Sequence, residues 1–151
     1  MIYQTDIRER NTANRIHELR QAAYAVESQL IDYAQLPPLL ETVEDLQHAR
    51  EHFLTFQEAE QIIGAVSYVQ AGDTLEICRL VVSPTHFRRG IAGRLLQALE
   101  TIQPGIRQII VSTAEKNLPA VTLYEKHGYH IARRTVLEDG LVLVELQKQI
   151  G

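Results

Sequence analysis

The chain has 151 residues, of which 45% are hydrophobic and 23% charged, a composition typical of one globular domain with a single core. Its net charge is −4, and its densest basic groups, Arg88-Arg89 and Arg133-Arg134, are too small for a nucleic-acid track. It contains no apolar run that could cross a membrane and no signal-peptide core at its start. The lone Cys78 cannot form an internal disulfide. We therefore expect a single domain over residues 1–151, located in the cytoplasm, with neither nucleic acid nor membrane as partner.

Hydrophobic spacing and turn residues predict alternating strands and helices along the whole chain. In chain order they are a strand at 2–5, helices at 13–29 and 42–51, strands at 52–58, 62–70 and 74–82, a helix at 93–103, a strand at 108–113, a helix at 119–127, and strands at 129–137 and 141–147. Thr42 with Asp45 three residues later resembles a capping box, and Pro37-Pro38 cannot continue the first helix. Gly128 is a natural helix cap, and Glu138-Asp139-Gly140 is a hairpin signal.

The order of these elements indicates the fold class. Three consecutive strands over 52–82 predict an antiparallel meander, and the later strands alternate with helices. Such an arrangement belongs to the α+β class, with a mixed sheet and helices packed on it.

A phosphate-binding loop is predicted between the strand that ends at Val82 and the next helix. Unpaired N–H groups and the helix dipole favour anions at a helix N-terminus, and small residues permit their close approach. The loop supplies these in order: Arg88, Arg89, Gly90, Ile91, Ala92 and Gly93. It lacks the Gly-Lys-Ser/Thr of a Walker A loop and the G-x-G-x-x-G of a dinucleotide fingerprint.

Two motifs resemble those of the Gcn5-related N-acetyltransferase (GNAT) superfamily, and the resemblance covers essentially the whole chain. The first is Val82-Ser83-Pro84 followed by Gly90 and Ala92, similar to the family's Arg/Gln-x-x-Gly-x-Gly/Ala loop. Phe87 stands where that pattern has Arg or Gln, and we interpret Arg88, one position later, as its substitute. The second is Asn117-Leu118-Pro119-Ala120 continuing to Leu123-Tyr124-Glu125-Lys126-His127-Gly128-Tyr129, similar to the family's Asn-x-x-Ala…Leu-Tyr-Glu-Lys-x-Gly-Phe/Tyr segment.

The resemblance implies a central, mostly antiparallel sheet with helices on both faces and acetyl-CoA as cosubstrate, without a metal. In this family the loop amides hold the coenzyme A pyrophosphate, and the preceding strand pairs with the pantetheine arm. The cofactor-binding residues implied here are Leu80, Val81, Val82, Arg88, Arg89, Gly90, Ile91, Ala92, Gly93, Asn117 and Tyr124. The cofactor would occupy the gap where the strand 74–82 diverges from the strand 108–113.

Glu76 and Tyr124 are the candidate catalytic residues. The family often places a carboxylate base at the strand position of Glu76, which would act through water; the alternative is an exposed strand residue or a partner of Arg79. The hydroxyl of Tyr124 would face the thioester sulfur as the acid; the alternative is a packed aromatic. Asn117 can cap a helix and still contact the cofactor.

The function implied is transfer of an acetyl group to a primary amine of a small molecule or a peptide. Candidate walls of the amine site are Tyr24, Tyr33, Leu36 and Arg133, and a homodimer is compatible with the family. A non-catalytic acyl-CoA-binding or sensor domain is the alternative function, since it would keep the phosphate loop without needing Glu76 or Tyr124.

Overall fold

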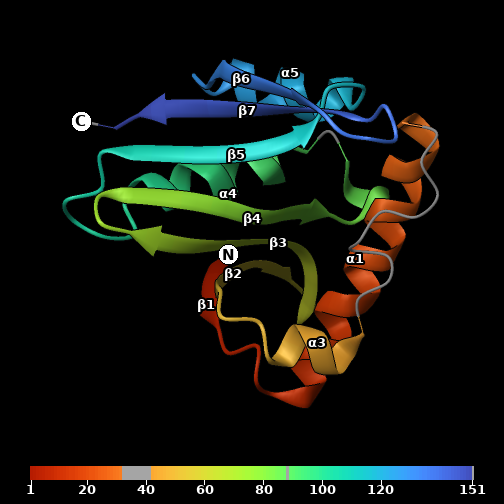
Figure 1. The fold of residues 1–151 in the computed structure, drawn as a ribbon. Coiled ribbons are helices and arrows are strands. Elements are labelled where there is room, and N and C mark those ends of the chain that lie inside the picture. Colours follow the sequence, from red (N-terminus) through yellow and green to blue (C-terminus); the bar gives the residue numbers. More distant parts are fainter. Residues whose placement is uncertain (32–41, 88, 151) are drawn as a thin grey trace.

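The computed structural model describes residues 1–31, 42–87 and 89–150 (Figure 1). Its elements in chain order are β1 (Ile2–Thr5), α1 (Arg10–Ile31), α3 (Val43–Gln47), β2 (His52–Glu58), β3 (Gln61–Ala71), β4 (Thr74–Val82), the 3₁₀ turn η1 (Pro84–His86), α4 (Ile91–Glu100), β5 (Gln108–Ala114), α5 (Leu118–Lys126), β6 (His130–Val136) and β7 (Val142–Gln149). The predicted order of strands and helices is confirmed.

The strands form one seven-stranded sheet in the order β1-β2-β3-β4-β5-β7-β6. Among the described strands β4 and β5 pair in parallel, and the other neighbours run antiparallel. The parallel pair requires a crossover, which α4 supplies. The predicted meander is β2-β3-β4, and the sheet is mixed and mostly antiparallel, as expected.

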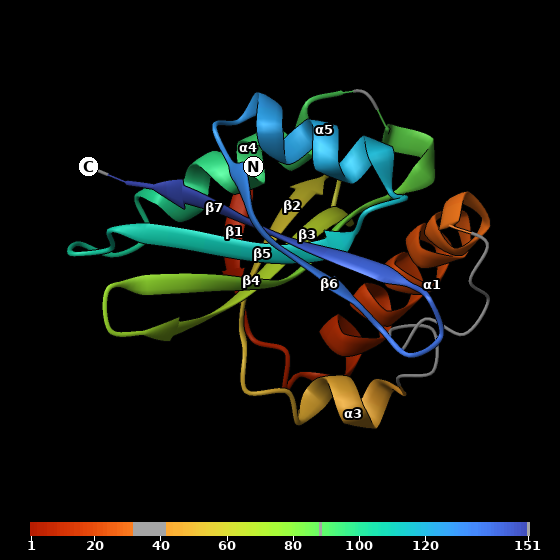
Figure 2. The same cartoon turned by 45° about the horizontal axis from the view of Figure 1, so that its top comes forward.

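Helices cover both faces of this sheet (Figure 2). On one face, α4 and α5 pack through residues such as Leu95, Leu99 and Val121 onto the main core, which includes Leu75 and Ile109. On the other face, α1 and α3 cover smaller apolar clusters. Both faces of the central strands are therefore buried over part of their length, which explains their nearly continuous apolar sequences. No helix in the described part of the chain is both long and apolar enough to span a bilayer.

Several predicted helix boundaries shift in the structure. The helix expected at 13–29 extends over Arg10–Ile31, and the one expected at 42–51 ends at Gln47. The segment 32–41, where we expected Pro37-Pro38 to stop the first helix, lies outside the described residues. The capping box is confirmed: Thr42 Oγ1 accepts from the Asp45 amide, and an Asp45 carboxylate oxygen accepts from the Thr42 amide.

A β-bulge in β4 marks the place where the sheet opens. The pairing of β4 with β3 shifts between Arg79↔Ser67 and Ile77↔Tyr68, so that Cys78 is an extra residue. The pairing of β4 with β5 ends at Ile77↔Val111. Because a bulge bends a strand and increases its twist, it accounts for the divergence of β4 from β5 beyond this point.

Candidate functional site

A cleft of about 750 Å³ lies on the α4 and α5 side of the opening between β4 and β5. It is bordered by the last residues of β4, by η1, by the first turn of α4 and by one face of α5, and two α1 residues reach it. The structure brings most of the predicted cofactor-binding residues to this cleft: Leu80, Val81, Val82, Gly90, Ile91, Ala92, Gly93, Asn117 and Tyr124. Motifs far apart in the sequence thus form one site.

The N-terminus of α4 opens into the cleft. The helix begins at Ile91, two residues before the predicted start, because Gly90 adopts a left-handed conformation (φ 75°, ψ 12°) and acts as N-cap. The first intrahelical bond is Arg94 N–H to Gly90 O at 3.1 Å, so the amides of Ile91, Ala92 and Gly93 have no acceptor within the helix. A Cβ added at Gly90 would meet no atom within 4 Å. This end of the helix has the space and the donors that a phosphate needs.

The charge of the cleft matches an anionic ligand. None of the described lining residues is acidic, whereas His86, Lys126 and His127 are basic, and the remainder are mostly apolar. A polyanion with an apolar arm is the kind of ligand that suits such a lining. The residues present therefore fit coenzyme A.

Tyr124 and Asn117 come to the cleft from α5. Tyr124 is 5% exposed, and its ring lies 5.6 Å from that of Tyr129, tilted by 58°. Asn117 is the N-cap of α5, where its Oδ1 accepts from the Ala120 amide at 3.3 Å. The capping role considered for Asn117 is confirmed, and it holds the side chain at the edge of the cleft.

Glu76 is exposed and does not border the cleft. Its neighbours Leu75 and Ile77 belong to the core beneath α4, so alternation along β4 directs Glu76 to the opposite face. Burial, together with the carboxylates of Glu51 and Glu76, raises the pKa of Cys78 to about 12, which disfavours a thiolate nucleophile. Glu76 is thus on the α1 face, next to the opening, while Tyr124 is on the α5 face.

The alternative partner that we considered for Glu76 is engaged elsewhere. The guanidinium of Arg79 pairs with Glu51 through Nε–Oε1 at 2.6 Å and Nη2–Oε2 at 2.9 Å, and Ser67 Oγ donates to the same carboxylate at 2.6 Å. Both charged side chains are nearly buried. This ion pair lies on the α1 face immediately after the bulge and fixes the strand there. The described residues contain no cluster of three or more metal-ligating side chains.

Of the two arginines predicted to contact the cofactor, the structure describes Arg89 and not Arg88. Arg88 lies outside the described residues, so its substitution for Phe87 stays a prediction. The Arg89 side chain is not brought to the cleft; it pairs with Glu58 at 3.1 Å on the surface. Phe87 itself is 46% exposed and borders the cleft.

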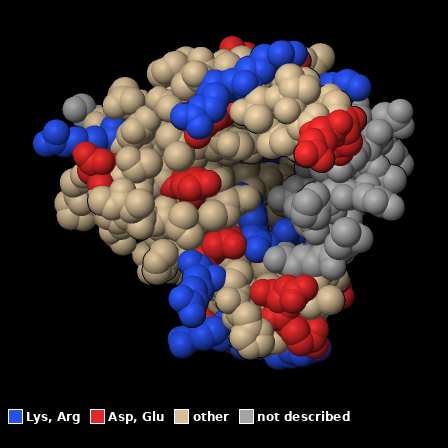
Figure 3. Space-filling model, viewed as in Figure 1, with Lys and Arg blue, Asp and Glu red and all other residues tan. Residues whose placement is uncertain are grey.

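The predicted walls of the amine site are described only at one position. Tyr33 and Leu36, and the side chain of Tyr24, lie outside the described residues. Arg133 is exposed on β6, opposite Glu145 of β7. The face that carries α1 and α3 shows acidic and basic side chains interspersed around a hollow (Figure 3). Such interspersed charges do not form a continuous basic track on this face.

His127 is a lining residue that our list of cofactor-binding residues did not include. The signal was present: Asn117, Ala120, Tyr124 and His127 follow one another at spacings of three, four and three residues. Residues so spaced share one helix face. All four border the cleft.

The fold and the cleft suit an acyltransferase, and comparison with known sequences identifies the family. The profile of the Acetyltransferase (GNAT) family matches residues 13–129, and the chain belongs to this family. A curated relative, the UPF0157 protein YqkA of Bacillus subtilis (strain 168), is 37% identical over 136 residues, which are 90% of this chain. The match covers 40% of YqkA, so the chain spans about two fifths of that protein's length.

Solved structures confirm the fold. The ribosomal-protein-S18-alanine N-acetyltransferase of Escherichia coli superposes with a TM-score of 0.76 at 17% identity, covering 100% of this chain and 95% of that one. The PaiA N-acetyltransferase of Thermoplasma acidophilum, solved in complex with coenzyme A, has a TM-score of 0.76 at 15% identity and covers 99% of both chains.

Proposed function

We propose that this protein is an acetyl-CoA-dependent N-acetyltransferase that acts on a primary amine of a small molecule or a peptide. The observation that carries the proposal is the cleft in which three features occur together. They are the α4 amides that have no acceptor within the helix, a lining whose described residues include no acidic side chain, and the hydroxyl-bearing Tyr124. Membership of the GNAT family supports acetyl transfer, and family relatives such as PaiA have been solved with coenzyme A.

The residues that would hold acetyl-CoA follow from this arrangement. The amides of Ile91, Ala92 and Gly93 would bind the pyrophosphate, and the backbone of Leu80–Val82, which has no ladder pairing with β5 in the described chain, would bind the pantetheine amides. The bound thioester supplies the acetyl group. This leaves the protein to position the amine and to manage the protons.

In the transfer, a bond forms from the amine nitrogen to the acetyl carbon while the carbon–sulfur bond breaks. The nitrogen loses one proton and the departing thiolate gains one. Tyr124 would donate a hydrogen bond to that sulfur. Because a tyrosine pKa is about 10 and a thiol pKa about 8.5, full proton delivery is uphill by roughly 2 kcal/mol and follows the stabilisation of charge.

Glu76 would accept the amine proton through water. A lysine-like amine costs roughly 4–5 kcal/mol to deprotonate at pH 7, so a base is needed for such a substrate. The opening next to Ile77 separates Glu76 on one face from Tyr124 on the other. The amine would therefore arrive from the α1 face, opposite the cofactor.

The direct test is a panel of primary amines incubated with acetyl-CoA, with release of free coenzyme A followed by a thiol reagent. We expect at least one amine to give product whose mass carries the added acetyl group. Coenzyme A binding without turnover on any amine would favour the sensor domain instead. No binding at all would overturn both functions.

Location and assembly are parts of the same proposal. The lone Cys78 fits a reducing compartment such as the cytoplasm. We further propose that residues 1–151 act as one domain, and a homodimer is compatible with it.

A further inference from the structure

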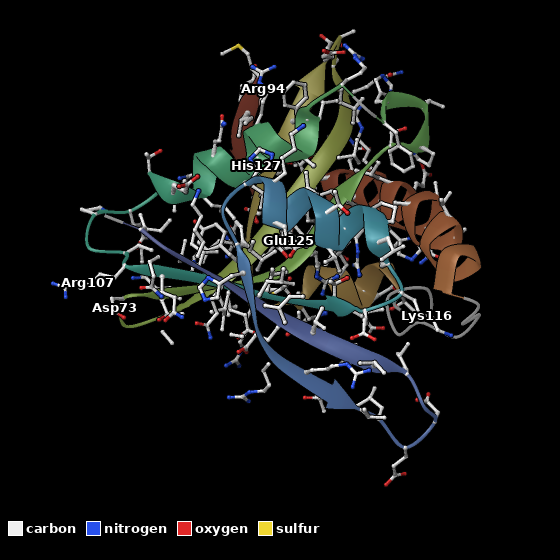
Figure 4. All side chains as sticks on the ribbon, turned by 90° about the horizontal axis from the view of Figure 1, so that it is seen from above. Asp73, Arg94, Arg107, Lys116, Glu125 and His127 are labelled. Atoms are coloured by element: carbon white, nitrogen blue, oxygen red, sulfur yellow. The ribbon has the colours of Figure 1, made fainter. Side chains whose placement is uncertain are left out.

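His127 lies beside the first turn of α4, although it directly follows α5 in the sequence. It is the C-cap of that helix, and Figure 4 shows it next to α4. A Cβ built on Gly93 would lie only 2.7 Å from both Cε1 and Nε2 of the His127 ring. Only a glycine at position 93 permits the ring to rest there. The pair Gly93–His127 thus brings an imidazole to the helix end predicted to bind phosphate.

The side chain of His127 reaches the cleft without being tied up by a hydrogen bond among the described residues. Its backbone amide donates to Leu123 O at 3.2 Å and to Tyr124 O at 3.0 Å. Neither ring nitrogen has a hydrogen-bond partner among the described residues. The side chain is partly buried and borders the cleft on the same helix face as Tyr124.

The charged groups considered for His127 come from four elements, α5, η1, α4 and β7. On its own helix Glu125 and Lys126 precede it, and His86 borders the same cleft. On α4 the guanidinium of Arg94 lies over the Phe56 ring at 4.8 Å. On β7 Lys148 packs at Gly128 and pairs with Glu100 at 3.0 Å. Since these cations accompany the positive end of α4, an anion placed here would favour the protonated ring.

We propose that His127 binds a phosphate group of the cofactor and that binding takes up a proton on its imidazole. This inference rests on the proposed function, because the phosphate belongs to coenzyme A. An imidazole titrates near pH 6.5, and contact with a phosphate raises its pKa. The bound state then holds more protons than the free state around neutrality, so affinity rises as the pH falls from 8 to 6.

The first measurement is calorimetry with 3′-dephospho-CoA at pH 6 and pH 8, which tests for contact with the diphosphate. This probe keeps the diphosphate, which stays ionised in this range, and lacks the phosphate monoester that itself titrates near pH 6. We expect the unsubstituted protein to bind it about sixfold more tightly at pH 6 than at pH 8, as for an imidazole whose pKa rises by about one unit on binding. His127→Gln should lose most of this pH dependence, and His86→Gln, at the other histidine of the cleft, should keep it. His130→Gln, at an exposed position of β6, should keep the pH dependence.

Coenzyme A itself distinguishes the two phosphate sources. If His127→Gln changes the pH dependence for coenzyme A and not for the dephospho form, the imidazole contacts the 3′-phosphate. If it changes both, the contact is with the diphosphate. Either result supports the proposal.

An independent readout is the pKa of His127 measured by NMR in the free and the ligand-saturated protein. We expect this pKa to rise on binding. The measurement uses the unsubstituted protein, so it does not depend on whether a variant folds. An unchanged pKa together with an unchanged pH profile in His127→Gln overturns the proposal while leaving the proposed function intact. If no coenzyme A derivative binds at any pH, the proposed function fails instead.

Discussion

At Tyr124, substitution by Phe removes the hydroxyl and keeps the packed ring. The ring packs against Tyr129, and Tyr129 N–H donates to Tyr124 O at 3.0 Å, so Tyr124→Phe should leave the fold intact. Losing a donor that acts on charge developing in the transition state lowers kcat on the order of 10²–10⁴-fold, with acetyl-CoA affinity nearly unchanged. Steady-state turnover and calorimetry on the same preparation measure both.

Tyr129→Phe is the matched control for this prediction. The Tyr129 hydroxyl is buried without a hydrogen-bond partner among the described residues, and burial raises its pKa. Removing it leaves no partner unsatisfied, so stability should stay equal or increase. Its kcat should match that of the unsubstituted protein. A normal kcat in Tyr124→Phe would mean that the Tyr124 hydroxyl takes no part in catalysis and that the residue serves only in packing.

Cys78 provides a residue-scale prediction about pH. Burial first, and then the carboxylates of Glu51 and Glu76, raise the pKa of its thiol to about 12. The thiol form therefore persists through neutral pH, and reactivity grows only as the pH approaches that value. Cys78 is exposed, so the reagent can reach it, and alkylation at pH 8 should be slower than for a free cysteine because of the raised pKa.

Mass spectrometry after timed exposure to iodoacetamide follows this reaction. Glu76→Gln removes one of the charges that oppose the thiolate and should accelerate alkylation. A rate equal to that of free cysteine would contradict the environment described for Cys78.

At the scale of elements, the N-terminus of α4 depends on Gly90. Asn and Asp have nearly the same size, and both tolerate the left-handed conformation better than other side chains. Gly90→Asp and Gly90→Asn should therefore cost similar stability, but only the former adds a negative charge where the pyrophosphate would bind. We expect the Asp variant to bind coenzyme A on the order of 10²-fold or more weakly than the Asn variant, because juxtaposed like charges cost several kcal/mol.

Calorimetry and circular dichroism of the two variants decide this point. Equal affinities in folded proteins would mean that the anion-binding end of α4 is not the pyrophosphate site. Equal losses of fold would instead show that Gly90 serves the helix start alone.

The sequence predicted the strands and helices well, but it did not predict the exact start of α4 or the β-bulge in β4. Strands over 2–5, 52–58 and 74–82 match β1, β2 and β4, because strand spacing and turn residues agree there. The start of α4 was placed too late, since the small residues after Gly90 suit a loop as well as a first turn. The bulge at Cys78 depends on pairing with β3, which no local pattern specifies, although apolar positions do change from 75 and 77 to 80 and 82.

For the candidate site, the sequence predicted most of the lining residues but not the direction of every side chain. Motif residues of α4 and α5 did converge on one cleft. Glu76 and Arg89 did not reach it, because the direction of a side chain is set by sheet faces and surface ion pairs that lie far away in the sequence. The helix spacing alone could have identified His127 as a lining residue.

For the whole molecule, ligand binding should appear as increased stability. Coenzyme A at about 100 times its Kd should raise the free energy of unfolding by about 2.7 kcal/mol, or roughly 5–10 °C in Tm for a chain of this size. Thermal unfolding with coenzyme A, and with ATP at the same concentration, measures this. We expect a shift with coenzyme A that exceeds the shift with ATP, and the reverse order would support a nucleotide-binding module.

The opening between β4 and β5 also has a consequence for cooperativity. Four residue pairs, Thr74↔Gln108 to Ile77↔Val111, are the described backbone pairing between the strands β1–β4 and the strands β5–β7. A short ladder favours sub-global unfolding, in which the C-terminal strands separate at less than the free energy of complete unfolding. A ligand that contacts both β4 and α5 suppresses this opening. Amide hydrogen exchange in β5 and β7 should accordingly slow on coenzyme A binding, even at residues that never touch it.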